Sequence, residues 1–160
     1  MTSPQLDALD WRILDQLQQD ASLSNQALAE RVHVSPATCL RRVKRLVDSG
    51  VIEKRIAILS PGAVGAGLTA VVEITLDHQA AERLSGFEAR AAADPAVQQC
   101  YRTSSGPDFV LIAQVRDMEA YHALAHRLLT SDANVRNVKT YFSVKRSKFA
   151  PALALPGPAA

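Results

Sequence analysis

Ser24 and Ser35 constrain what this chain can fold into more than any other feature, because each stands where a short helix is expected to begin. A serine in this position accepts a hydrogen bond from a backbone N–H that the first helical turn leaves free. Pro36 strengthens the second start, since proline lacks the N–H that would be unsatisfied there. Gly50 ends that second helix. Only His33-Val34 separates the two helices, and this spacing predicts a helix-turn-helix.

Another helix is predicted before this pair and a small hairpin after it. Apolar residues recur at helical spacing over residues 9–17. Asp7 and Asp10 stand near the start of that helix, where carboxylates suit the helix dipole. The alternating run VIEKRIAIL, residues 51–59, is typical of a hairpin. Together these elements predict a winged helix-turn-helix.

Basic residues concentrate around the second helix of the pair. Residues 31–55 hold seven basic and two acidic residues, a local net charge of +5, whereas the whole chain carries only +2. On a helical wheel the packed arc is predicted to contain Cys39, Leu40, Val43, Leu46 and Val47. The opposite arc contains Thr38, Arg41, Arg42 and Arg45, with Lys44 at its flank. Such an outward basic stripe fits the major groove of double-stranded DNA, where arginine pairs with guanine edges and either basic residue with phosphates.

The residues predicted to contact DNA lie on this helix and in the run that follows it: Ser35, Pro36, Ala37, Thr38, Arg41, Arg42, Lys44, Arg45, Lys54 and Arg55. Two other interpretations stay open. The stripe is also compatible with a solvated face of an exposed helix. Lys54 and Arg55 are equally compatible with edge charges that deter aggregation. The corresponding alternative for the protein is a small-molecule-binding or assembly protein whose helical domain contacts protein instead of DNA.

A second domain is predicted after a linker at residues 61–67, PGAVGAG. The alternating segment GLTAVVEITL predicts a strand, and helical spacing over residues 79–93 predicts a helix. Strands follow at 97–104 and 108–115, then a helix marked by Met118, Tyr121, Ala125 and Leu128, and a last strand over Val138, Thr140, Phe142 and Val144. This βαββαβ order is the ferredoxin-like arrangement.

The expected fold class is therefore α+β, with a winged helix-turn-helix at residues 1–60 and a ferredoxin-like domain at residues 68–148. The tail at 149–160 is expected to be disordered. The strand DFVLIAQV is apolar on both faces, although the helices of such a domain cover only one face of the sheet. A partner surface is expected on the other face, which predicts a homodimer. A two-fold dimer would also double the contacts of a single helix-turn-helix across half-sites.

Few residues indicate catalysis or metal binding. His122 and His126 have a spacing that can bind zinc, but they lack a partner ligand and are interpreted as surface residues. Cys39 and Cys100 are interpreted as small packed residues. No nucleotide-binding or hydrolase motif is present in the sequence, so neither an enzyme nor a cofactor is expected. No apolar run reaches membrane-spanning length, and the cytoplasm is the expected location.

Three segments resemble the Lrp/AsnC (feast/famine) transcriptional regulators: LDxxDxxIL at residues 6–14, SPATCLRRVKRLVDSGVI at 35–52, and GPDFVL at 106–111. The resemblance implies a sequence-specific DNA-binding regulator. Its C-terminal domain would dimerise, associate further to a tetramer or octamer, and bind a small effector, usually an amino acid. These properties come from the resemblance and not from periodicity.

The resemblance also implies where an effector binds. The family's loop commonly reads like TGDYDY, and the matching segment here is SSGPDF, with Ser105 in place of the usual glycine and Gly106 in place of the first acidic residue. The implied effector contacts are Ser104, Ser105, Gly106, Asp108 and Thr140. In this interpretation Asp108 would bind an ammonium group and loop N–H groups a carboxylate. The alternative is that Asp108 is a turn residue that caps its own backbone.

Overall fold

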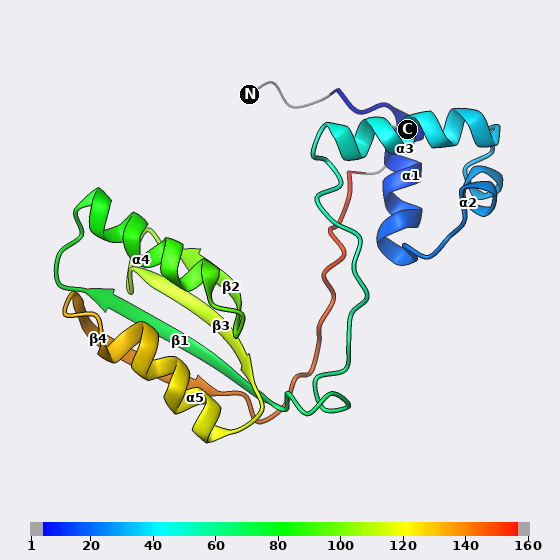
Figure 1. Cartoon of the computed structure of the whole chain (residues 1–160). Helices are drawn as coiled ribbons and strands as arrows, with labels where there is room; N and C mark the ends of the chain where they lie inside the picture. Colours follow the sequence, from blue (N-terminus) through cyan, green and yellow to red (C-terminus); the bar gives the residue numbers. More distant parts are fainter. Residues whose placement is uncertain (1–4, 157–160) are drawn as a thin grey trace. The chain divides into compact units, whose positions relative to one another are not determined.

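The structure, a computed structural model, describes residues 5–156 and contains two compact units (Figure 1). One unit comprises the chain up to Ile58 together with the stretch that begins at Lys148. The other comprises Leu59–Ser147.

The first unit contains three helices, α1 (Ala8–Gln19), α2 (Asn25–Arg31) and α3 (Pro36–Asp48). Both predicted serine caps are confirmed. The Ser24 side chain accepts a hydrogen bond from the backbone N–H of Ala27, and the Ser35 side chain accepts one from Thr38. Since both helix starts are fixed locally, the two helices need only pack together to complete the helix-turn-helix.

A residue with a left-handed backbone conformation follows each of the two helices of this motif. His33, in the turn between α2 and α3, has a φ of 57°, and Gly50, just after α3, has a φ of 75°. A left-handed residue at these positions reverses the chain within one or two residues. The small core between the helices is formed by Ile13, Leu17, Leu28, Ala29, Val32, Cys39 and Leu46.

The hairpin predicted after α3 is not formed in this structure, because residues 53–60 have no strand partner and no strand is assigned between α3 and β1. A hairpin needs a second alternating segment that returns beside the first. Here the chain instead enters a series of turns, in which the N–H groups of Ala63 and Ala66 bond the carbonyls of Ser60 and Pro61.

The second unit has the predicted ferredoxin-like order, and the strands closely match the predicted segments. The elements in chain order are β1 (Leu68–Leu76), α4 (Ala81–Ala93), β2 (Val97–Arg102), β3 (Phe109–Val115), α5 (Met118–Ala125), a π-helical turn (His126–Thr130) and β4 (Val135–Phe142). The sheet order is β2-β3-β1-β4, and every neighbouring pair is antiparallel. Figure 1 shows α4 and α5 on the same face of this sheet.

The two faces of the sheet differ as the alternation in β1 predicts. Ala70, Val72, Ile74 and Leu76 are buried under the helices, and the residues between them are only half-buried. Met118 begins α5 and is 45 % exposed. The placement of Val144 in the last strand is wrong, because Val144 lies beyond the end of β4 and is fully exposed. We call the side of the sheet without helices the open face.

The C-terminal tail, which was predicted to be disordered, has a contact with α1. The backbone N–H and carbonyl of Leu153 each form a hydrogen bond with the Gln18 side chain, at 3.0 and 2.9 Å. Residues 145–156 otherwise contain no helix or strand. Within residues 5–156, no helix is both long enough and apolar enough to cross a bilayer.

Candidate DNA-binding helix and effector pocket

Ion pairs between α1 and α3 fix two of the predicted DNA-binding arginines. The Arg42 guanidinium lies 2.5 Å from a carboxylate oxygen of Asp7 and 3.3 Å from one of Asp10. Arg45 forms an ion pair with the other oxygen of Asp10. Asp10 has no solvent exposure, so its charge needs these partners. We call these four residues the Asp–Arg cluster.

The same carboxylates cap α1. Asp7 accepts hydrogen bonds from the N–H groups of Leu9 and Asp10, while Asp10 accepts one from the N–H of Asp7. The backbone hydrogen bond from Asp10, together with the neighbouring Arg42 guanidinium, lowers the pKa of Asp7 from 3.8 to about 2. The pKa of Arg42 is raised in turn by its bond to Asp7. The start of α1 and the side of α3 are thus joined by one network.

The exposed arc of α3 differs from the predicted stripe. Cys39 and Leu46 are buried as predicted, but Leu40 and Val47, which were predicted to pack, are 59 % and 46 % exposed. Arg42 is half-buried beside α1 rather than outward, with 24 % of its side chain exposed. The residues exposed along the first three turns of α3 are Pro36, Ala37, Leu40, Arg41, Lys44 and Arg45. Of these exposed basic residues, Arg45 is paired with Asp10, whereas Arg41 and Lys44 form no ion pair with a carboxylate in residues 5–156.

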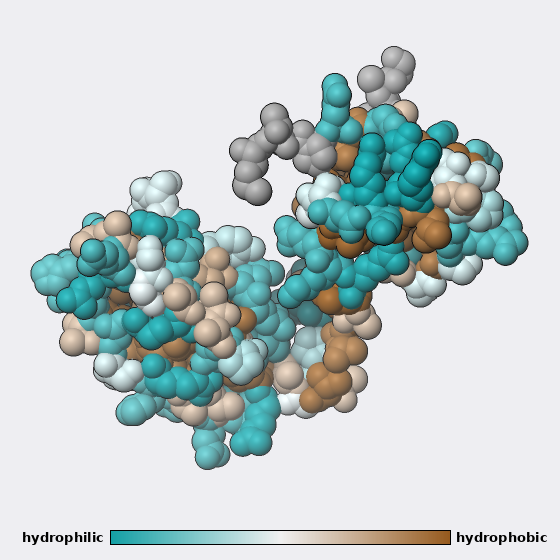
Figure 2. All heavy atoms as spheres, turned by 45° about the horizontal axis from the view of Figure 1, so that its top comes forward, coloured by the Kyte–Doolittle hydropathy of each residue, from teal (hydrophilic) through white to brown (hydrophobic). Residues whose placement is uncertain are grey.

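Other predicted DNA contacts lie at the start of α3 and in the segment that follows it. Thr38 is half-buried and its hydroxyl accepts a hydrogen bond from Ser35. Lys54 and Arg55 are exposed in the extended segment after α3. Figure 2 shows hydrophilic side chains over most of the visible face of the helical unit, interrupted by hydrophobic patches. A contact of any of these residues with DNA stays a prediction.

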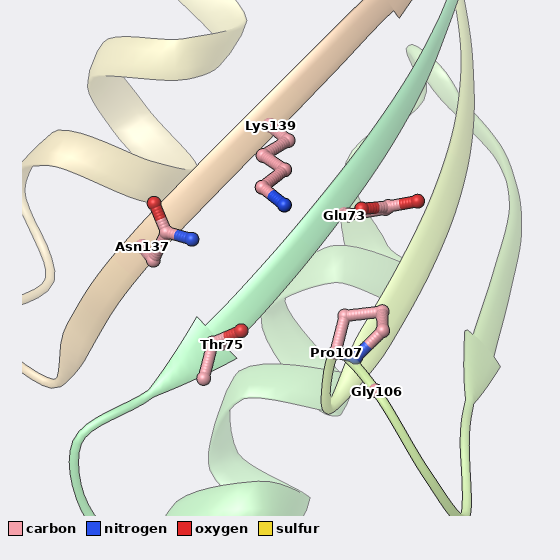
Figure 3. A pocket seen from close by; sticks show the side chains of 6 residues that line it. All are labelled: Glu73, Thr75, Gly106, Pro107, Asn137 and Lys139. Atoms are coloured by element: carbon pink, nitrogen blue, oxygen red, sulfur yellow. The ribbon is translucent and has the colours of Figure 1, made fainter.

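The second unit contains a pocket of about 180 Å³ on the open face. Its lining residues are Glu73, Thr75, Gly106, Pro107, Asn137 and Lys139 (Figure 3). Glu73 and Lys139 are direct cross-strand neighbours of β1 and β4, as are Thr75 and Asn137. Figure 3 shows the Glu73 carboxylate directed toward β3 and the Lys139 ammonium directed toward β1, with Thr75 and Asn137 beyond them. The pocket therefore has a carboxylate, an ammonium group and neutral polar groups on adjoining strands.

Of the predicted effector contacts, only Gly106 lines this pocket. Gly106 has a φ of 83°, a conformation that glycine adopts without strain. Ser104 and Ser105 are exposed in the same loop. The Asp108 carboxylate accepts a hydrogen bond of 2.7 Å from the backbone N–H of Leu76, and its own N–H bonds Ile74. The Asp108 carboxylate therefore accepts its hydrogen bond from the backbone of β1, whereas the alternative prediction was that it caps the backbone of its own turn.

Thr140 lies on the opposite side of the sheet. Its hydroxyl forms a hydrogen bond with the Tyr121 hydroxyl of α5, so it belongs to the helix-covered face.

Sequence reasoning missed Glu73 and Lys139. A usable signal was present for Glu73, which is the only charged residue in the otherwise apolar and neutral strand LTAVVEITL.

The remaining candidates for catalysis or metal binding are two cysteines and two histidines. Burial raises the pKa of the Cys39 and Cys100 thiols, which disfavours the reactive thiolate. His122 and His126 are exposed. In the described part of the chain, no group of three or more histidine, cysteine or acidic side chains is placed to hold a metal ion.

Comparisons with known proteins agree with this arrangement. A winged helix-turn-helix DNA-binding family matches residues 6–53, and the Lrp/AsnC ligand binding domain family matches residues 69–153. An HTH-type transcriptional regulator of Haemophilus influenzae is 42% identical over 143 residues, 89% of this chain and 85% of that protein. The leucine-responsive regulatory protein of Rhizobium meliloti is 36% identical over 144 residues, 90% of this chain and 92% of its own length.

A solved structure has the same fold at similar identity. A transcriptional regulator of Neisseria meningitidis, solved as a complex with L-Met, superposes with a TM-score of 0.85 at 34% identity and covers 93% of this chain and 96% of that one. Fold and site together define a helix-turn-helix transcriptional regulator with a separate ligand-binding domain. The chain belongs to the Lrp/AsnC family.

The lowered pKa of Asp7 leads to a prediction about stability in acid. A carboxyl group whose pKa is lower in the folded state stabilises the fold above its ordinary pKa and loses this effect as the pH falls through the folded value. The variant Asp7→Asn removes the titration but keeps a good helix-capping side chain. We expect the free energy of unfolding of the wild type to decrease between about pH 4 and pH 2 more steeply than that of the variant.

The difference should be about 1 kcal/mol or less, because the Asp7 side chain is 52 % exposed and solvent screens the pair. Urea unfolding followed by the fluorescence of Trp11, the single tryptophan, in α1 measures the helical unit. Identical pH profiles for the two proteins would contradict the assignment.

Proposed function

We propose that this protein regulates transcription by binding double-stranded DNA with α3 of a homodimer and by sensing an amino acid or a close derivative in the open-face pocket. The observation that carries the DNA contact is the pair Arg41 and Lys44, exposed on a helix whose other side is held by the Asp–Arg cluster. A helix fixed in this way presents basic groups without further ordering, which favours insertion into a major groove. Lys54 and Arg55 extend the positive surface toward phosphates.

We propose two different roles for the basic residues of α3. Arg41 and Lys44 are proposed as the leading DNA contacts, because they are exposed and form no ion pair with a carboxylate in residues 5–156. Arg42 is proposed as a positioning residue that joins α3 to α1. Arg45 remains half-exposed although it is paired with Asp10, so it adds positive charge beside the groove-facing arc.

We expect Arg41→Ala and Lys44→Ala each to weaken DNA binding. A residue that contacts a phosphate should reduce the steepness of the dependence of affinity on salt by about 0.9 in the log–log slope. A residue that pairs with a guanine should instead cost about 1 to 3 kcal/mol at one position of the site. Fluorescence anisotropy at several salt concentrations measures both effects, with Arg116→Ala in the second unit as the matched control. Unchanged affinity in both α3 variants, with unchanged helical content, would count against α3 as the DNA-binding helix.

The pocket chemistry supports a zwitterionic ligand. Lys139 can bind a carboxylate and Glu73 an ammonium group, while Thr75 and Asn137 offer neutral hydrogen bonds. A volume of about 180 Å³ is below the range of drug-sized ligand sites and suits a small metabolite. The Neisseria meningitidis regulator that binds L-Met supports an amino acid as the ligand class.

We expect a thermal-shift screen of the standard amino acids to find a ligand that stabilises the second unit. A ligand at 100 times its dissociation constant adds about 2.7 kcal/mol to the free energy of unfolding. Lys139→Gln should lose most of the shift given by the amino acid, and Glu73→Gln should lose the part that depends on the ammonium group. Glu119→Gln, on α5, is the control.

Analogues that lack one charge identify the partner of each group. The amine without the carboxylate should be insensitive to Lys139→Gln, and the acid without the ammonium should be insensitive to Glu73→Gln. An amino acid that stabilises the wild type and both variants equally would exclude this pocket as its site.

The open face supports a homodimer. Besides the pocket it carries apolar side chains from all four strands, namely exposed Tyr101 and Tyr141 and half-buried Val71, Val110 and Ile112. Such a patch on a sheet is typical of a protein interface. Further association to a tetramer or octamer is proposed from family membership alone.

We expect the wild type to be a dimer or larger by light scattering at micromolar concentration, and Ile112→Glu to dissociate it, because a buried unpaired carboxylate at the interface is costly. Met118→Glu places the same charge on α5, under the opposite face, and should leave the assembly intact. A wild-type monomer, or equal dissociation by both variants, would contradict an interface on the open face.

A further inference from the structure

Leu40 is a large apolar side chain on the exposed arc of the helix that is proposed to bind DNA. Its side chain is 59 % exposed although the helical core lies directly beneath α3. Its neighbours on the same arc are Ala37, one turn earlier, and Arg41 and Lys44, which follow it. Leaving a leucine in water costs about 1.5 to 3 kcal/mol relative to burying it, so the helix gains stability if a partner covers this residue.

The Asp–Arg cluster prevents α3 from covering Leu40 itself. Rotation of α3 about its axis toward the core would bury Leu40, but it would also pull Arg42 and Arg45 away from Asp10. Asp10 is completely buried, and an unpaired carboxylate in that position is strongly destabilising. The outward position of Leu40 is therefore enforced by the fold rather than tolerated by it.

The charge of the residues around Leu40 indicates what kind of surface would cover it. Arg41 and Lys44 lie beside Leu40, and no acidic residue lies on α3 before Asp48. An apolar side chain enclosed by basic groups matches a surface that is negative at its rim and apolar at its centre. The major groove has this composition, because phosphates line its edges and the C5-methyl of thymine is the one apolar group that base edges present there.

We infer that Leu40, with Ala37 one turn before it, is a specificity-determining residue that reads thymine through its C5-methyl group. This inference rests on the proposed DNA-binding function and adds a base contact that arginine pairing does not supply. Recognition helices contact base edges mainly with their N-terminal residues, and Leu40 lies in the second turn of α3. Val47, which is also exposed, lies in the last turn and is expected to be beyond the bases.

The test uses the full-length protein and DNA that it selects itself. Duplexes are enriched from a random pool with the wild type, and the affinity of the enriched duplex is measured. Each thymine is then replaced singly by uracil, which removes only the C5-methyl group. We expect one or more positions at which this replacement weakens wild-type binding about three- to five-fold, the effect of exposing one methyl group.

Leu40→Ala and Leu40→Gln should bind the thymine and uracil duplexes equally, whereas Val47→Ala should keep the wild-type discrimination. Because Leu40 is exposed, these variants are expected to retain the wild-type unfolding transition, which Trp11 fluorescence checks.

Insensitivity of the wild type to every uracil replacement, or discrimination that survives in both Leu40 variants, overturns the inference while DNA binding stands. Loss of a homo-oligomer in the Leu40 variants with unchanged DNA affinity also overturns it, since Leu40 would then cover a protein. Failure of the wild type to enrich any duplex rejects the proposed function itself.

Discussion

One buried carboxylate, Asp10, determines which side chains α3 presents to solvent. It is fully buried, so its charge is stable there only with the guanidinium groups of Arg42 and Arg45 beside it. The cluster also closes the capping box at the start of α1. Because two of the basic residues of α3 are held against α1, the outward arc is centred on Ala37, Leu40, Arg41 and Lys44. The proposed reading of DNA depends on this rotation of the helix more than on the number of basic residues.

The helix boundaries of the first unit could be predicted because serine, proline and glycine act within one turn of their own positions. The rotation of α3 could not, because the helical wheel places apolar residues inward and charged residues outward without regard to partners on another helix. Leu40 and Val47 were therefore assigned to the core and Arg42 to solvent, whereas Asp7 and Asp10, some 35 residues earlier, decide the outcome. No strands are assigned in the segment predicted to form a hairpin for a related reason, since one alternating segment does not supply its own pairing partner.

The ferredoxin-like unit was more predictable, because alternation with period two assigns each residue of β1 to a face directly. The pocket was harder to predict from the sequence, because its charged residues come from β1 and β4. These strands are far apart in the sequence, and only their pairing in the sheet brings Glu73 opposite Lys139. The loop residues named from the family resemblance share one chain segment, and only Gly106 among them lines the pocket. The carboxylate of Asp108, which was predicted to suit an ammonium group, accepts a hydrogen bond from the backbone N–H of Leu76.

The register also suggests how a ligand could act on assembly. Successive open-face rows of the β1–β4 pair are Val71 with Tyr141, Glu73 with Lys139, and Thr75 with Asn137. Glu73 is also paired with Val110 of β3, so the charged pair of the pocket lies within the apolar surface proposed for the dimer. A zwitterion that neutralises Glu73 and Lys139 changes the cost of removing that pair from water when another sheet covers it. Its effect on DNA binding is limited to the difference in its affinity for the two assemblies, typically about 1 to 3 kcal/mol, so the signal should modulate binding rather than create it.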